Sequence, residues 1–287
     1  MNQTGYVGRF APSPSGPLHM GSLVTALGSF LQAKVNNGKW LLRIDDIDPP
    51  RIQAGAIENI QSCLTAHGLI WDGDVFFQSQ NAEHYERIIS QLNSQKLLYP
   101  CECTRGKIKA LGEFYKGTCR EKTQVKSPYS LRLKNQFEIS QIEDRRLGTL
   151  QVNSQATQED FIVRRKDGLY AYHLASVADD IQMGITEIVR GEDLITATAC
   201  QWALFKTLGR TPPECLHLPL VTFADGRKFS KQNHAPGLDL SKPVKNLTDA
   251  LAYLNLTVPN SFQSNHQIDE VLSWAIHAWA DSPSNIL

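Results

Sequence analysis

The first hundred residues alternate between short apolar runs and segments whose apolar positions recur every three or four residues. A short apolar run bounded by turn residues predicts a buried strand, and the longer period predicts an amphipathic helix. The pattern predicts strands over Gly5–Ala11 and Trp40–Ile44, with a helix over Met20–Val35 between them. Strands that alternate with helices are typical of an α/β fold with a mainly parallel sheet.

The α/β pattern is interrupted between about residues 99 and 161. This stretch has clustered cysteines, many Lys and Arg, and short alternating runs, and it predicts an insertion with its own small fold. Further helices are expected at residues 54–67, 83–97, 172–183 and 194–208, and further strands at 75–78, 185–189 and 216–223. From Pro243 the spacing predicts a small all-α appendix. The expected division is 1–98 and 162–240 for the two halves of one domain, 99–161 for the insertion and 241–287 for the appendix.

Composition narrows the possible functions only partly. The chain has 287 residues, 29 Lys+Arg against 29 Asp+Glu and 41% hydrophobic residues, which excludes a disordered tail and a disulfide-rich miniprotein. Zero net charge gives no overall basis for binding nucleic acid, so such a function must rest on local sites. No apolar run approaches the roughly 18 residues of a membrane helix, and no signal-peptide pattern begins the chain. We therefore expect a cytoplasmic protein without membrane contact.

The turn before the first helix is a candidate phosphate site. It runs from Arg9 through a Pro-rich stretch to His19-Met20-Gly21-Ser22. The unpaired N–H groups of a helix N-terminus suit a phosphate, Gly21 would allow close approach, and His19 could donate a hydrogen bond. A Pro-rich turn with a capping histidine explains the same residues without any ligand.

The segment Lys228-Phe229-Ser230-Lys231-Gln232-Asn233 is a second candidate. Its two lysines are three residues apart beside a turn at Gly226, and both could place ammonium groups on a polyphosphate. A solvated basic loop is the more common explanation for such a pair.

Together and in this order, the two segments resemble the ATP-binding motifs of class I aminoacyl-tRNA synthetases, His-Ile-Gly-His and Lys-Met-Ser-Lys-Ser. The segments Arg9–Pro14 and Arg43–Arg51 are similar to the glutamyl branch, which commonly lacks the second histidine. The resemblance implies a Rossmann-type parallel sheet, ATP with Mg²⁺, and catalytic roles for His19, Lys228 and Lys231. The implied ATP-binding residues are His19, Gly21, Ser22, Lys228, Ser230 and Lys231.

Only 51 residues, Gly237 to Leu287, follow the second motif. A full glutamyl-tRNA synthetase carries a large anticodon-binding module there, so none is expected here, and the chain looks most like the short glutamyl-queuosine tRNA(Asp) synthetases. That family implies activation of L-glutamate with ATP and its transfer to the queuosine base in the anticodon loop of tRNA(Asp). Two alternatives are a truncated glutamyl-tRNA synthetase that charges the tRNA 3′ end and a catalytically silent paralogue that binds RNA or an amino acid.

A glutamate site needs arginines for the two carboxylates and an acidic group for the ammonium. Arg9 lies at the end of the first predicted strand and Asp45 at the end of the second, at the sheet edge where ligands bind. For Arg190, an ion pair with Glu192 or Asp193 is a purely structural alternative. The family usually has Glu in place of Asp45. The resemblance implies glutamate contacts from Arg9, Phe10, Ala11, Pro12, Ser13, Asp45, Tyr172 and Arg190.

Three of the six cysteines, Cys101, Cys103 and Cys119, lie in one short stretch and are candidate zinc ligands. Tetrahedral Zn²⁺ needs a fourth ligand, for which the segment offers Glu102, Glu113 and Tyr115; three reduced, buried cysteines are the alternative. The resemblance implies a structural Zn²⁺ held by Cys101, Cys103, Tyr115 and Cys119. The other cysteines are predicted to be core residues: Cys63, Cys200 and Cys215.

Charge is concentrated around this cluster. From Cys101 to Asn135 there are nine Lys and Arg residues and three Glu residues, a local balance of +6. Such a patch favours a surface that contacts tRNA phosphates, although a merely solvated face has the same composition.

Overall fold

The computed structural model describes residues 5–110, 112, 114–223, 227, 229, 235–259, 262 and 267–282. The helices are α1 (Met20–Val35), α2 (Ala56–Ala66), α3 (Ala82–Ser94), α4 (Arg105–Ala110), α5 (Ser154–Thr157), α6 (Tyr172–Met183), α7 (Ile195–Thr207), α8 (Pro243–Tyr253) and α9 (Ile268–Ala280). The strands are β1 (Val7–Phe10), β2 (Lys39–Ile44), β3 (Phe76–Phe77), β4 (Leu98–Cys101), β5 (Ser130–Leu133), β6 (Gln141–Asp144), β7 (Gly148–Gln151), β8 (Ile162–Arg164), β9 (Glu187–Gly191) and β10 (Glu214–Leu218). Each helix and strand expected in the α/β part is present, within three residues of its predicted ends except at β10, which ends at Leu218, five residues before its predicted end. Among the described helices, none is long and apolar enough to cross a membrane.

A parallel sheet forms the centre of the fold, as predicted. β1, β2 and β3 pair in parallel, and β9, β10 and β6 form a second parallel set. The two sets lie side by side, because the Thr186 N–H donates to the Val7 carbonyl at 2.9 Å. The carboxyl ends of β1, β2, β9 and β10 therefore meet at one edge of the combined layer, where ligands bind in open α/β sheets.

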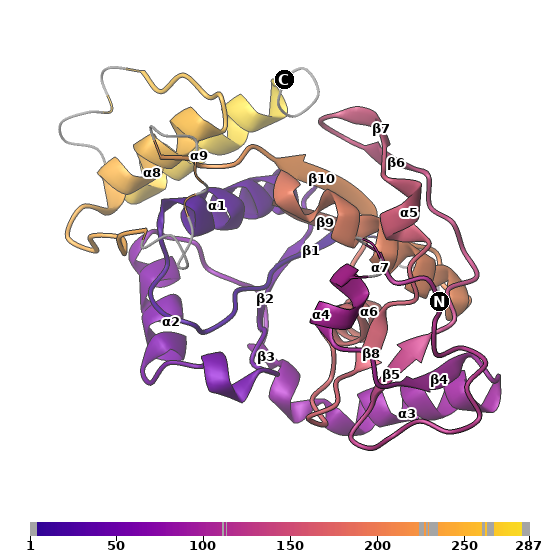
Figure 1. Cartoon of the computed structure of the whole chain (residues 1–287). Coiled ribbons are helices and arrows are strands. Elements are labelled where there is room, and N and C mark those ends of the chain that lie inside the picture. The colour runs from indigo at the N-terminus through magenta and orange to yellow at the C-terminus, as the bar shows by residue number, and fades with distance from the viewer. Residues whose placement is uncertain are drawn as a thin grey trace.

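Helix α1 lies in the middle of the main core. Figure 1 shows α8 and α9 lying over α1, with the sheet beneath it. Leu251 of α8 and Trp279 of α9 are fully buried in the same apolar cluster as Leu27 and Leu31 of α1. The C-terminal segment is helical, as expected from its spacing, but it completes the core of the α/β domain instead of forming a separate unit.

The expected insertion at residues 99–161 does not form a single small sheet. β4, β5 and β8 make an antiparallel sheet, so pairing crosses both predicted boundaries. The β6–β7 hairpin instead extends the parallel sheet, with Asp144 opposite Cys215 of β10. Local periodicity could not show this, because it carries no information about which distant strand becomes the neighbour.

Gln32 of α1 joins the sheet to the C-terminal helix, and its loss should destabilise the fold. Its Nε2 donates to Glu187 of β9 at 2.9 Å, and its Oε1 accepts from the Trp279 indole at 2.9 Å. Gln32→Leu removes both hydrogen bonds and leaves the Glu187 carboxylate and the Trp279 indole N–H without this buried partner, so we expect the free energy of unfolding to fall by about 2–4 kcal/mol. Urea unfolding measures this. The matched change Gln91→Leu on the exposed surface of α3 should stay within about 0.5 kcal/mol of wild type; an equal loss in both variants would contradict the bridging role.

Candidate functional site

A cleft of about 490 Å³ lies where the carboxyl ends of β1, β2 and β9 meet the start of α1. Among its lining residues are all the predicted ATP- and glutamate-binding residues that the structure describes: Arg9, Phe10, Ala11, Pro12, Ser13, His19, Gly21, Ser22, Asp45, Tyr172 and Arg190. The remaining predicted residues, Lys228, Ser230 and Lys231, lie outside the described residues. Residues distant in the sequence are thus brought into one cleft by the parallel sheet.

The start of α1 brings the two predicted ATP motifs together. His19 is the N-cap, and its Nδ1 accepts a hydrogen bond from the Ser22 backbone N–H at 3.2 Å, so the capping role is present. A Cβ on Gly21 would lie 3.2 Å from the His19 ring and 3.3 Å from the Phe229 carbonyl oxygen. Phe229 belongs to the second motif, and its ring meets the His19 ring edge-on at 6.3 Å. Gly21 therefore lets the second motif pass close to the helix start.

A buried ion-pair network fixes the floor of the cleft. Asp180 of α6 accepts from Arg9 Nε at 3.0 Å and from Arg43 Nη1 at 2.7 Å. Arg43 also donates to Asp45 at 2.7 Å and to the Ser176 hydroxyl at 3.2 Å. Burial alone would raise the pKa of Asp180, but the two guanidinium groups lower it, whereas burial keeps the pKa of Asp45 raised. Arg9 and Asp45 are therefore held rigidly by partners behind them.

The sequence motifs predict no role for Arg43 or Asp180. Both are charged residues that lie next to apolar residues on buried parts of their elements: Arg43 follows Leu41 and Leu42 in β2, and Asp180 follows Asp179 on the buried part of α6. Since a charge is rarely buried without a partner, these apolar neighbours are the available signal. The identity of the partners was not, because Arg43 and Asp180 are 137 residues apart.

Arg190 of β9 differs from the other arginines of the cleft. It is 4% exposed, and its Nη2 donates to the Thr198 hydroxyl at 2.7 Å while Nη1 donates to the Tyr172 hydroxyl at 3.4 Å. Its Nε is buried without a hydrogen-bond partner. Burial lowers the pKa of Arg190, although an arginine stays charged at neutral pH.

The expected alternative for Arg190, an ion pair with Glu192 or Asp193, does not form. Glu192 pairs instead with Arg146 of the β6–β7 turn at 2.7 Å. Within the described part of the chain, no carboxylate lies within ion-pair distance of Arg190. A buried cation without a counter-ion is costly, and an anionic ligand would compensate its charge.

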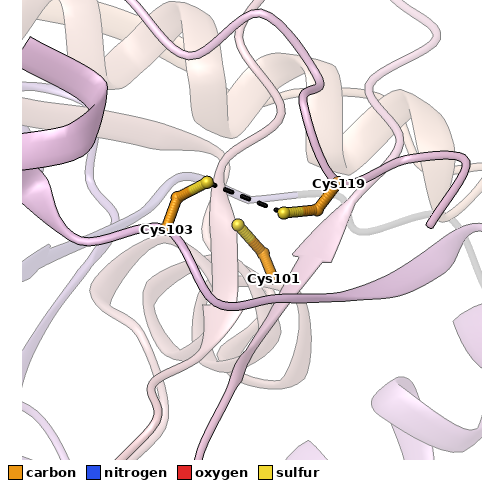
Figure 2. A group of neighbouring side chains, drawn as sticks. All are labelled: Cys101, Cys103 and Cys119. Carbon is orange, nitrogen blue, oxygen red and sulfur yellow. Dashed lines mark hydrogen bonds between the residues drawn. The ribbon is translucent and has the colours of Figure 1, made fainter. Parts of the chain in front are cut away.

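The three clustered cysteines converge on one point (Figure 2). Their sulfur atoms all lie within 4.8 Å of one another, and Cys103 and Cys119 are 3.6 Å apart. The Tyr115 hydroxyl lies 3.4 Å from the Cys101 sulfur. Three convergent thiols make a possible metal site, because soft sulfur ligands with this spacing suit Zn²⁺.

The other candidates for a fourth ligand are placed differently. Glu102 accepts from Lys122 at 2.8 Å on the surface, and Glu113 lies outside the described residues. Tyr115 is buried, and the Arg132 guanidinium lies 3.8 Å above its ring. The three cysteines predicted to be core residues are buried: Cys63, Cys200 and Cys215.

A second cavity of about 920 Å³ adjoins the cleft between α4, α6 and β8. Ser13, Asp45, Arg51 and Tyr172 line both cavities, and Tyr172 itself is 41% exposed. Aromatic and cationic side chains gather in the second cavity: Phe114, Phe161, Tyr170, Tyr172, His173, Arg51, Arg105, Lys109, Arg132 and Arg165. Burial and the charge of Arg190 lower the pKa of His173 to about 4, so this imidazole is neutral at pH 7.

The basic segment around the cysteines is only partly neutralised. Three of its cations face carboxylates: Arg120 pairs with Asp160, Lys122 with Glu102, and Arg132 with Glu159. Six have no ion pair with a described carboxylate: Arg105, Lys107, Lys109, Lys116, Lys126 and Lys134. Arg105 and Lys109 also line the second cavity, so uncompensated positive charge borders it.

Comparison with known proteins agrees with this geometry. The family described as tRNA synthetases class I (E and Q), catalytic domain, matches residues 6–256. A glutamyl-Q tRNA(Asp) synthetase from Photobacterium profundum is 49% identical over 276 residues, covering 96% of this chain and 89% of the relative. One from Idiomarina loihiensis is 46% identical over 274 residues, covering 96% of both.

The solved structures that resemble the chain are longer. A glutamate-tRNA synthetase from Elizabethkingia anophelis superposes with a TM-score of 0.76 at 26% identity, over 93% of this chain and 65% of that one. A glutamate tRNA ligase from Elizabethkingia meningosepticum, solved in complex with its amino acid, gives a TM-score of 0.75 at 26% identity, over 93% and 64%. This chain thus spans just under two thirds of those structures.

Proposed function

The chain belongs to the family of glutamyl-Q tRNA(Asp) synthetases and has the class I tRNA synthetase fold, and from this premise we propose its reaction. It activates L-glutamate with ATP and transfers the glutamyl group to the queuosine base of tRNA(Asp). The observation that carries the proposal is the pair of adjoining cavities, which share Ser13, Asp45 and Tyr172. One has the groups for an amino acid and a nucleotide, and the other has the groups for an acceptor nucleotide.

In the first step, an oxygen of the glutamate α-carboxylate attacks the α-phosphorus of ATP. The bond from that phosphorus to the bridging oxygen breaks, and pyrophosphate leaves. The nucleophile belongs to the substrate, so the protein contributes positioning and charge stabilisation. The α1 N-terminus with His19 and Gly21 supports phosphate binding there. Ser22 and, from the second motif, Lys228, Ser230 and Lys231 would complete the phosphate site. Mg²⁺ would accompany ATP and neutralise part of its phosphate charge, as it does for nucleotide substrates in general.

The glutamate contacts follow from the charges of the cleft. Arg190 has no carboxylate partner among the described residues and offers a buried cation to one glutamate carboxylate. Arg9 uses only Nε and Nη2 on Asp180, so Nη1 remains for the substrate. Asp45 would accept from the substrate ammonium. The remaining predicted contacts, Phe10 to Ser13 and Tyr172, line the same cleft.

In the second step, a queuosine hydroxyl attacks the glutamyl carbonyl carbon, AMP leaves, and the hydroxyl loses its proton. The second cavity supports this step because aromatic faces stack on bases and cations bind the flanking phosphates. Arg105 and Lys109 are exposed on α4, one helical turn apart. Tyr172 lies in the wall between the two cavities, so an acceptor base in the second cavity would approach the adenylate directly.

We also propose that Cys101, Cys103, Tyr115 and Cys119 hold one structural Zn²⁺. The convergence of three thiols with the Tyr115 hydroxyl supports this set, and the Arg132 cation over the Tyr115 ring would balance its negative charge. A site closed by four protein ligands has no position for a reacting water, so the ion would stabilise the segment that presents α4.

The reaction is tested by locating the transferred label. Radiolabelled glutamate, ATP and queuosine-containing tRNA(Asp) should give label in the anticodon loop after nuclease mapping. The same tRNA without queuosine is the matched control and should accept none. Label on the 3′-terminal adenosine would contradict the proposal in favour of a glutamyl-tRNA synthetase, and no glutamate-dependent ATP–pyrophosphate exchange would indicate a silent paralogue.

The acceptor cavity is tested by reversing charge on α4. Arg105→Glu with Lys109→Glu should lower transfer to tRNA by about tenfold or more near 0.1 M salt, because two phosphate contacts become repulsive. Glutamate-dependent ATP–pyrophosphate exchange should change by less than about twofold. Lys39→Glu with Lys206→Glu makes the same charge change at exposed sites away from the cavity. An equal loss of transfer in this control would argue against a local tRNA contact.

The metal site is tested by metal analysis of protein purified without chelator. Wild type should carry about one zinc per chain, and Cys103→Ser should carry almost none and denature at lower temperature, because bound metal contributes folding free energy. Cys215→Ser is the matched control, since Cys215 belongs to a separate buried group with Asp144 and His217; it should keep its zinc. Wild type without zinc, or Cys103→Ser with a full complement, would refute the assignment.

A further inference from the structure

Arg190 is the end of a chain of buried hydrogen bonds that begins in the β6–β7 hairpin. Arg190 Nη2 donates to the Thr198 hydroxyl at 2.7 Å, and that hydroxyl lies 2.8 Å from His217 Nε2. His217 Nδ1 lies 2.7 Å from Asp144 Oδ2. All four residues are at most 5% exposed. They come from β9, α7, β10 and β6, so this series of hydrogen bonds crosses the three parallel strands of the second half of the sheet.

The charge of Asp144 sets the direction of these hydrogen bonds. Its oxygens also accept from the backbone N–H groups of Arg146, Leu147 and His217 at 2.8–3.0 Å, which stabilises the ionised carboxylate. The His217 imidazole therefore directs its Nδ1 proton to Asp144, and Nε2 accepts from Thr198. The Thr198 oxygen then faces Arg190 as an acceptor. Each bond polarises the next in a buried setting.

A metal site is the main alternative for this cluster. One ligand atom from each of Asp144, Cys215 and His217 lies within 4.8 Å of the others. Both ring nitrogens of His217 are already used in hydrogen bonds, and the Cys215 thiol donates to the Glu143 carbonyl at 3.4 Å. The cluster is thus internally satisfied, and its one open end is the guanidinium of Arg190, whose Nε has no partner.

The same hairpin keeps a competing carboxylate away from Arg190. Glu192 follows two residues after Arg190, and Arg146 in the hairpin turn holds it at 2.7 Å. Arg146 also donates to the His217 carbonyl, so this ion pair is connected to the same series of hydrogen bonds. The neutral Thr198 hydroxyl orients Arg190 without neutralising it, whereas an acidic partner would compete with an anionic substrate.

We propose that Thr198 and His217, fixed by Asp144, are positioning residues that hold Arg190 ready for a carboxylate of the amino-acid substrate. The β6–β7 hairpin is then part of the amino-acid site although it does not line the cleft. This inference rests on the proposed function, because it takes glutamate as the ligand of Arg190.

Thr198→Val keeps the shape of the side chain and removes the hydroxyl that Arg190 uses. The KM for glutamate in ATP–pyrophosphate exchange should rise about 10- to 100-fold, the effect of losing a hydrogen bond to a charged group. The KM for ATP should change by less than about threefold. Thr198→Ser restores the hydroxyl and should return the KM for glutamate to within about threefold of wild type.

Thr207→Val is the matched control on the same helix. The Thr198 and Thr207 hydroxyls lie 3.1 and 2.8 Å from the carbonyl one turn back. Thr207 donates its proton to that carbonyl, whereas Thr198 directs its proton to His217 at the shorter distance of 2.8 Å and accepts from Arg190. The KM of Thr207→Val for glutamate should stay within about twofold of wild type.

The double variant Thr198→Val with Arg190→Gln should bind glutamate no more weakly than Arg190→Gln alone, because Thr198 acts only through Arg190. Calorimetry measures this binding.

Asp144→Asn tests the other end of the series of hydrogen bonds. It also serves as the test if Thr198→Val fails to fold. Without the carboxylate, the imidazole proton moves to Nε2 and competes with Arg190 for the Thr198 oxygen, so the KM for glutamate should again rise selectively. An unchanged KM for glutamate in both variants, or an equal rise in Thr207→Val, would overturn the inference while the proposed function stands. A wild type without glutamate-dependent exchange would overturn both.

Discussion

The arrangement of the cleft depends on one buried carboxylate. Asp180 on α6 accepts hydrogen bonds from Arg9 at the end of β1 and from Arg43 at the end of β2. Removing three charges from water is costly unless each is closely paired, so these elements can pack only in the register that brings the three side chains together. Arg9 and Asp180 are 171 residues apart. Their contact therefore joins the two halves of the α/β domain, and it turns Arg9 and Asp45 toward the cleft.

Arg190 lies beside this network but is held in a different way. The arginines that build the floor of the cleft face carboxylates, whereas Arg190 faces two hydroxyls, those of Thr198 and Tyr172. A hydroxyl fixes the direction of a guanidinium and leaves its charge uncompensated. The difference separates arginines that stabilise the fold from one that remains available to an anion. It also explains why Glu192, which is adjacent in sequence, pairs with Arg146 instead.

The sequence predicted the elements and the lining of the cleft well, because periodicity and strand ends are local properties. Helix Tyr172–Met183 has the predicted bounds, and the residues after β1 and β2 reach the expected sheet edge. The partners of the buried charges could not be predicted, since Asp180 and His217 contact residues far along the chain. Local spacing places the β6–β7 hairpin in the insertion for the same reason: its pairing with β10 depends on the sheet as a whole.

The zero net charge of the chain has a structural counterpart in the way opposite charges are paired. Most charges in the interior of the described structure are paired with opposite charges, as in the Asp180 network, and these pairs contribute little to the field outside. The unmatched cations, such as Arg105 and Lys109, border the second cavity. A polyanion would therefore meet a local positive field on a neutral protein. An acceptor nucleotide drawn to that field would be placed next to an activated amino acid with little further movement, which reduces the entropic cost of the transfer step.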